Sequence, residues 1–175
     1  FIDGLTGMAQ GLFATLIIGT IIQQIGTYCG GNIGNLIFTL GKVAAGLTGA
    51  GIGAGVARKL DAGHLVIVSA AVVGTIGAFA GDVMSGAVLK GNALVLSGPG
   101  EPLGAFVASY IAIEIGILIS AKTRLDIILT PLVCIGAGAA VGLLVGPPIS
   151  GFMAWLGSLI NWGTEQQPLI MGIVV

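Results

Sequence analysis

Long apolar stretches, separated by short clusters of charged residues, dominate this chain. No charged side chain occurs from Gly4 to Gly41, or again from Ile127 to Thr164. Each stretch is longer than the roughly 20 apolar residues that a helix needs to cross a membrane. The pattern therefore predicts an all-α integral membrane protein, a multi-span helical bundle whose charged clusters mark the loops.

Six membrane spans are expected, the last of them truncated by the end of the chain. A Gly/Asn break at Cys29–Asn32 and charged clusters at Arg58–Asp61 and Lys122–Asp126 separate the earlier ones. Gly146-Pro147-Pro148 should end the fifth, because proline removes a backbone donor. The expected spans are about 5–25, 36–56, 64–81, 103–121, 127–145 and 168–175.

Two segments do not read as spans and are expected to be re-entrant or interfacial. Residues 82–102 hold prolines and glycines around short apolar pieces, which is too broken to span and too apolar for a solvated loop. Residues 149–162 carry Trp155 and Trp162, a residue type enriched at membrane interfaces. Residues 1–175 thus read as a single transmembrane domain with a broken hairpin. Because the chain stops inside an apolar run, we expect a fragment, the N-terminal half of a longer protein.

Composition excludes a soluble domain. Charged residues make up 7% of the chain, against about 25% in an ordinary globular protein. The net charge of −1 also leaves no basic face for nucleic acid, so no direct nucleic-acid partner is expected. Membrane lipid is the expected surrounding, and the basic residues of the two charged clusters place both on the cytoplasmic side.

Glycines four residues apart indicate close helix packing. In lipid, burying apolar area gives no gain, so small residues that let backbones approach mark the helix contacts. Gly49/Gly53 and Gly138/Gly142/Gly146 have this spacing. We expect their faces to lie against other helices.

The sequence offers little material for catalysis or metal binding. His64 is the only histidine, and Cys29 and Cys134 are expected to be small buried residues rather than ligands. We therefore expect no enzyme activity, no cofactor and no metal.

Two charged residues lie within the expected spans. A charge in the bilayer core costs at least about 2.5 kcal/mol, so its presence needs a reason. Glu114 is expected near mid-depth, protonated, paired or facing a polar cavity. Lys42 either snorkels to the interface or pairs with Glu114. These two residues are structural or proton-coupling candidates.

The run Ser97-Gly98-Pro99-Gly100-Glu101-Pro102 is the sharpest candidate for a binding site. Proline and glycine free backbone carbonyls and amides beside a carboxylate, and such broken backbone lines substrate sites in transporters. The alternative is a water-exposed turn. The expected substrate-binding residues are Asp82, Gly98, Pro99, Gly100, Glu101, Pro102 and Glu114.

Three motifs resemble the perfringolysin-regulator family of membrane proteins. They are Lys122–Val133, Gly142–Ile149 and Trp162–Gly172. That family is similar to the sugar-transporting IIC subunit of the bacterial phosphotransferase system. The resemblance implies a bacterial plasma-membrane location, a homodimer and, through a Gly-x-x-Glu-Pro loop at 98–102, contact of Glu101 with a sugar. No phosphorylatable IIA or IIB module accompanies it.

Two functions remain open. The first is a IIC-like transporter for a small polar solute, sugar-like or a carboxylate, without its own phosphorylation domains. The second is a non-transporting membrane sensor that binds a similar ligand and regulates gene expression. Solute uptake into proteoliposomes would separate them.

Overall fold

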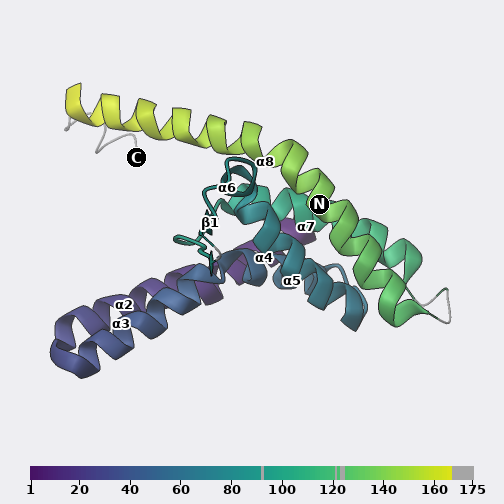
Figure 1. Cartoon of the computed structure of the whole chain (residues 1–175), viewed down its shortest axis with the longest axis horizontal. Coiled ribbons are helices and arrows are strands. Elements are labelled where there is room, and N and C mark those ends of the chain that lie inside the picture. The colour runs from purple at the N-terminus through teal and green to yellow at the C-terminus, as the bar shows by residue number, and fades with distance from the viewer. Residues whose placement is uncertain (92, 121, 123–124, 167–175) are drawn as a thin grey trace.

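The protein is helical almost throughout, as the computed structural model shows for residues 1–91, 93–120, 122 and 125–166 (Figure 1). A two-stranded hairpin is the one sheet among these residues. The expected all-α membrane bundle is confirmed. The elements are α1 (Ile2–Leu12), a π-helical segment (Phe13–Ile17), α2 (Ile18–Cys29), α3 (Gly31–Gly46), α4 (Thr48–Lys59), α5 (His64–Ala78), α6 (Ala80–Met84), β1 (Leu89–Lys90), β2 (Ala93–Leu94), α7 (Pro102–Ile119) and α8 (Asp126–Gln166).

Three helices of the described residues are long and apolar enough to cross a membrane. They are Ile2–Cys29, Pro102–Ile119 and Asp126–Gly163. A fourth span arises if α3 and α4, which meet at an angle of 49°, are counted together. Helix α5 is apolar but has only 15 residues. The expected span at 168–175 falls outside the described residues.

The first two spans form a long antiparallel hairpin that turns at Gly30 and Gly31 (Figure 1). Both glycines have positive φ angles, +63° and +62°, which L side chains rarely adopt. One rod contains α1, the π-helical segment and α2, and the other contains α3 and α4. Beyond the central bundle, α2 and α3 project as a two-helix arm.

Glycines hold this hairpin together by backbone contact. A Cβ atom on Gly7 would lie 2.5 Å from the carbonyl oxygen of Gly55, which leaves no room for any side chain. Two further pairs, in which each partner faces the other's carbonyl, occur at Gly19/Gly41 and Gly26/Gly34. Such close approach is how helices associate where lipid removes the hydrophobic driving force.

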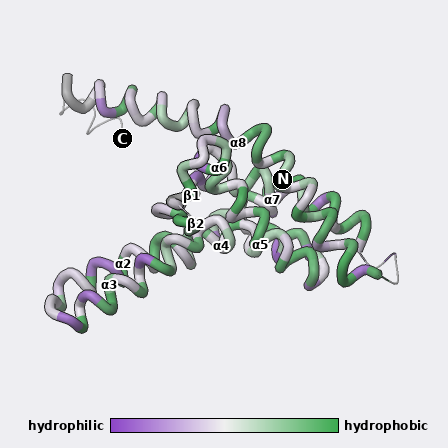
Figure 2. Tube along the Cα trace, in the orientation of Figure 1, coloured by the Kyte–Doolittle hydropathy of each residue, from purple (hydrophilic) through white to green (hydrophobic). Residues whose placement is uncertain are grey.

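Large apolar side chains make up much of the outer surface of the arm. Exposed large side chains on it include Ile18, Ile21, Ile25, Leu36 and Leu40. Figure 2 shows hydrophobic residues interspersed with intermediate and hydrophilic ones along α2 and α3. In a membrane, a helical hairpin with satisfied backbone groups and an apolar exterior is stable against lipid.

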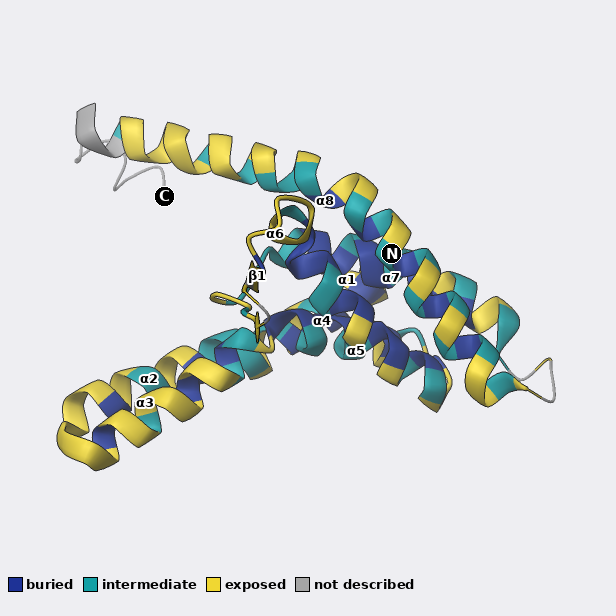
Figure 3. Ribbon diagram, in the orientation of Figure 1, coloured by how far each residue is buried: buried dark blue, intermediate teal, exposed yellow. Residues whose placement is uncertain are grey.

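The core lies where α4, α5, α7 and the first half of α8 meet (Figure 3). Small residues again set the spacing, because Gly49 and Gly74 face one another's backbone, as do Gly77 and Gly104. The predicted contact role of the Gly49/Gly53 and Gly138/Gly142/Gly146 series is confirmed, since a Cβ on each would touch a neighbouring helix. Fully buried Ile52, Val56, Val66, Val73 and Ile113 fill the space between these contacts.

The Arg58–Asp61 cluster lies at the same end of the bundle as the end of α7. A Cβ on Gly63, next to the Arg58–Asp61 cluster, would lie 3.4 Å from the Ser120 hydroxyl at the end of α7. Arg58 and Asp61 form an exposed 3.4 Å ion pair, the one salt bridge among the described residues. If basic loops face the cytoplasm, this end of the bundle is the cytoplasmic one.

The predicted end of the fifth span at Gly146-Pro147-Pro148 is wrong. Helix α8 runs without interruption for 41 residues and contains Pro131, Pro147 and Pro148. Proline keeps a helical φ angle, and in membrane helices neighbouring groups satisfy the freed carbonyls. Residues 149–162 are therefore the second half of α8, which extends away from the bundle (Figure 1).

The second expected span, residues 36–56, is also not one straight helix. It begins earlier, at Gly31, continues to Lys59, and bends at Leu47. The third, expected over 64–81, ends at Ala78 and is followed by the short helix α6. The prediction that Cys29 is buried is wrong as well, because it lies exposed at the tip of the arm, whereas Cys134 is buried as expected.

Candidate functional site

A pocket of about 690 Å³ lies at the base of the arm, beside the bend between α3 and α4. Three segments form it, namely the first rod, the end of α3, and the extended loop after β2. Its lining residues are Leu16, Thr20, Gln23, Thr39, Lys42, Val43, Ala45, Gly46, Val95, Leu96, Ser97, Gly98 and Pro99.

Helical spacing explains why the two helices present polar groups here. Thr20 and Gln23 are three residues apart on α2, and Thr39 and Lys42 are three apart on α3, so each pair shares one helix face. The glycine contacts bring the two faces together, because a Cβ on Gly41 would lie 2.8 Å from Cγ of Gln23. The hairpin thus places four polar side chains close together, in addition to the exposed Gln24, Thr27, Asn32 and Asn35 elsewhere on the arm.

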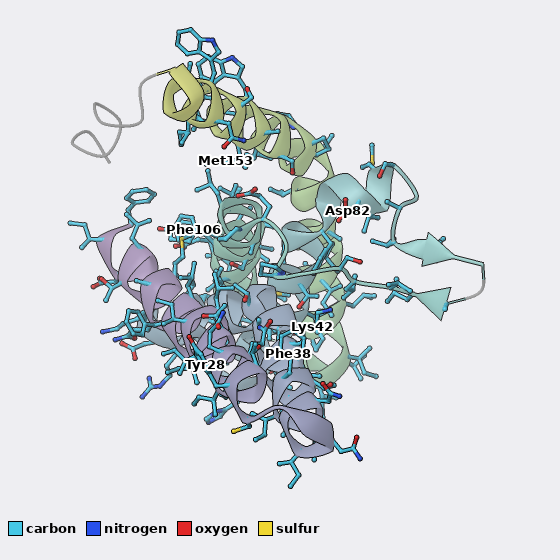
Figure 4. All side chains as sticks on the ribbon, turned by 90° about the vertical axis from the view of Figure 1, so that its left-hand side faces the viewer. Tyr28, Phe38, Lys42, Asp82, Phe106 and Met153 are labelled. Atoms are coloured by element: carbon cyan, nitrogen blue, oxygen red, sulfur yellow. The ribbon has the colours of Figure 1, made fainter. Side chains whose placement is uncertain are left out.

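Lys42 is the charged residue among the described residues that line this pocket (Figure 4). It lies 11 residues, or about 16 Å, from the start of α3, because α3 begins at Gly31 rather than near residue 36. A lysine side chain reaches much less far than this, so snorkelling past the arm's tip becomes harder than the sequence indicated. The pocket supplies polar surroundings for the ammonium group instead.

The other polar groups use their donors within their own helices. The Thr20 hydroxyl donates to the Ile17 carbonyl at 2.8 Å, and the Thr39 hydroxyl donates to the Asn35 carbonyl at 2.8 Å. The Gln23 amide nitrogen donates to the Gly19 carbonyl at 3.4 Å. Each of these side chains keeps an oxygen that can accept a hydrogen bond from a ligand.

The loop over the pocket is fixed by glycine and by one backbone hydrogen bond. Gly98 and Gly100 have φ angles of +80° and +72° on either side of Pro99. A Cβ on Gly100 would lie 2.7 Å from that of Ala78, so the loop rests directly on the end of α5. The Glu101 N–H then donates to the Ala78 carbonyl at 2.7 Å.

Glu101 itself begins helix α7. Its partly buried carboxylate accepts a hydrogen bond from the Leu103 N–H at 3.4 Å, and Pro102 occupies the first helical position. Proline lacks a backbone N–H, and it fits there because the N–H of the first helical residue would have no partner within the helix. Glu101 follows the pocket-lining Pro99 by two residues but is not itself among the lining residues.

The structure separates the remaining predicted site residues. Asp82 is exposed in the first turn of α6, on a different element from Lys42 (Figure 4). Glu114 is exposed on α7, one turn after Tyr110 and about one and a half turns before the helix ends at Ile119. The expected ion pair between Lys42 and Glu114, both of which the structure describes, is not formed.

Of the residues that line this pocket, sequence reasoning singled out Gly98 and Pro99, with Ser97 at the start of their run, and named Lys42 for a structural or proton-coupling role; it did not single out Thr20, Gln23 and Thr39. A signal for them was present. The glycines at 7, 11, 19 and 26 are mirrored about Gly30-Gly31 by those at 34, 41, 51 and 55. This mirrored pattern fixes the register of the hairpin, and in that register Gln23 lies beside Lys42.

A second concavity, of about 530 Å³, lies at the charged end of the bundle. It is lined by Asp3, Gln10, Arg58, Lys59 and Asp61. The described residues contain no group of three or more His, Cys, Asp or Glu placed to hold a metal ion.

Comparison with known proteins gives one result for the whole chain. The family model described as phosphotransferase system, EIIC, matches residues 2–175. No curated protein and no solved structure matches. Because the family match covers nearly every residue, this multi-pass membrane chain belongs to the EIIC family, the membrane components of the sugar-type phosphotransferase system.

Proposed function

We propose that this chain takes part in moving a small, hydroxyl-rich solute across the bacterial plasma membrane. The solute would bind in the pocket at the base of the arm, with Lys42 and Ser97 as donors and with Thr20, Gln23 and Thr39 as acceptors. The observation that carries this proposal is the pocket itself, where five polar side chains line a mostly apolar hollow at the point where α3 and α4 bend.

Polar and charged side chains are energetically costly to place in lipid. Threonine and glutamine oxygens and a lysine ammonium have no reason to converge on a lipid-facing arm unless water or a polar ligand occupies the space between them. Transporters commonly build their substrate sites from broken helices and freed backbone. The bend at Leu47 and the Gly98-Pro99-Gly100 loop supply both features here.

Under this proposal Glu101 positions the loop rather than contacting the solute. Its carboxylate already caps α7, and its N–H already anchors the loop to α5. Asp82 and Glu114 lie outside the pocket and would not bind the solute. The chain would act with separate phosphorylating partners, and a second copy of itself would complete a homodimer.

The test is counterflow in proteoliposomes containing the full chain. Vesicles loaded with a panel of unlabelled hexoses, hexitols and hexuronates are challenged with the same compounds in radiolabelled form. Accumulation that Gln23→Leu and Ser97→Val each reduce supports the proposal. Lys59→Gln, which alters an exposed lysine outside the pocket, serves as the control and should leave uptake unchanged.

Two results would contradict the transport proposal. Binding of a solute with no counterflow would favour a sensor that reads the same pocket. Counterflow that survives both pocket substitutions would place the solute elsewhere in the molecule.

A further inference from the structure

The charge and hydrogen-bonding capacity of the pocket narrow the class of solute. We infer that the pocket selects a monoanionic sugar acid, whose carboxylate pairs with Lys42 while its hydroxyls donate to Thr20, Thr39 and Gln23. This inference rests on the proposed transport function, because it concerns the same pocket.

Lys42 gives the pocket a positive charge. This is a single charge, and the described residues lining the pocket include no carboxylate to neutralise it. Its one candidate acidic partner from sequence, Glu114, lies on α7, outside the pocket, and forms no ion pair with it. Lys42 is exposed within the pocket, so a bound anion can reach its ammonium group and supply the missing counter-charge.

The second step is the type of anion. A carboxylate carries one negative charge, which a single lysine balances. A phosphate monoester carries about −1.5 to −2 at neutral pH and would leave part of its charge uncompensated in the same pocket. The single lysine therefore matches a carboxylate better than a phosphate.

The third step is the hydrogen-bond count. Thr20, Thr39 and Gln23 each spend a donor on a carbonyl of their own helix, so each presents an oxygen that accepts. The carbonyl of Gly98 lies near the bend, 4.0 Å from where a Cβ on Gly46 would be, and adds a further acceptor. A ligand that matches several acceptors and one cationic donor carries several hydroxyl groups and one anion.

The fourth step is location. Lys42 and its neighbours lie on the arm, whereas Arg58 and Lys59 line a separate concavity at the other end of α4. An anion reaching Lys42 therefore meets no competing basic residue among those lining the pocket. Because opposite charges attract strongly where water is scarce, the pairing should contribute more to affinity here than at an exposed surface.

Matched pairs of compounds provide the test. Counterflow is measured for glucuronate against glucose, galacturonate against galactose, and gluconate against glucitol. Within each pair only one terminal group changes from CH2OH or its equivalent to a carboxylate. We expect the acid to saturate uptake at a concentration about tenfold or more below that of its neutral partner, as a charge-assisted hydrogen bond allows.

Substitution of Lys42 then identifies the source of the preference. Lys42→Gln should bring each acid and its neutral partner to within about threefold, because KM rises more for the acid than for the neutral compound. Lys42→Arg keeps the charge and should keep the preference. Lys59→Gln is the matched control, since it removes one lysine charge outside the pocket.

The outcomes are distinguishable from those of the transport proposal. Equal or stronger uptake of the neutral members by the unmodified protein overturns the sugar-acid inference but leaves transport standing. This comparison needs no variant, so it decides the question even if Lys42→Gln does not fold. A preference for acids that persists in a folded Lys42→Gln variant also overturns the inference. No counterflow of any of the six compounds counts against transport itself, and the inference falls with it.

Discussion

The backbone N–H of Glu101 donates a 2.7 Å hydrogen bond to the carbonyl of Ala78. Ala78 is the last residue of α5, and Glu101 is the residue that caps α7. The segment between them, which includes α6 and the β-hairpin, therefore starts and ends at the same point of the bundle. This closure holds the Ser97–Pro99 stretch over the pocket.

Gly100→Ala should destabilise the protein more than Gly86→Ala. Both glycines have φ angles above +70°, so both substitutions introduce backbone strain of about 1–2 kcal/mol. At Gly100 the added Cβ would also meet Ala78, whereas at Gly86 nothing lies within 4 Å. Thermal unfolding in detergent measures the difference, and equal melting temperatures would show that the loop does not rest on α5.

Gly142→Leu should lower stability by about 1–3 kcal/mol, the usual effect of overpacking. A Cβ on Gly142 would already lie 3.3 Å from that of Ala108 and 3.4 Å from Cα of Gly77. Gly136→Leu, on the same helix but with nothing within 4 Å, is the matched control and should have little effect. An unchanged melting temperature for Gly142→Leu would mean that this face of α8 is not packed.

Substitutions of Glu101 separate a capping role from a ligand role. Glu101→Gln keeps an oxygen that can accept from the Leu103 N–H, so stability and solute affinity should change little. Glu101→Ala removes the cap and should cost about 1 kcal/mol of stability. If Glu101→Gln weakens binding at an unchanged melting temperature, the carboxylate contacts the solute, as its Gly-x-x-Glu-Pro setting implied.

Cysteine labelling tests the topology, with Cys29 as a native probe at the tip of the arm. Lys59→Cys and Lys122→Cys, introduced after Cys29→Ser, should both react with an impermeant maleimide from the cytoplasmic side. Cys29 in the otherwise unchanged protein should react from the opposite side, because the 28-residue helix Ile2–Cys29 separates it from that end. Labelling of Lys59→Cys and Lys122→Cys from opposite sides would overturn the assignment.

The positions of charged residues predicted where the loops lie. They predicted less accurately where each helix ends. The Arg58–Asp61 cluster marks a true turn, since charged groups stay out of lipid whatever their neighbours do. Pro147-Pro148 was misjudged, because the effect of proline depends on whether nearby groups replace the lost hydrogen bonds. That information belongs to the packing and not to the local sequence.

Only part of the proposed pocket was recognisable from the sequence, because the rest depends on how the helices pack. The Gly98-Pro99-Gly100 loop is recognisable from composition alone, since no other backbone tolerates those angles as readily. The contribution of Gln23 depends on the register of two helices, which several distant glycines determine together. A single charged residue in an apolar run can be recognised from the sequence. A polar surface formed by two helices can be recognised only when their register is known.

The reciprocal glycine contacts have a thermal consequence. In pairs such as Gly26/Gly34, the Cα–H groups face carbonyl oxygens, a weak but recurrent form of hydrogen bond. Separating them within a membrane exposes little apolar surface to water, so the accompanying heat-capacity change should be small. The arm should therefore keep its pairing on cooling, under conditions in which assemblies held by water-driven burial of apolar surface loosen.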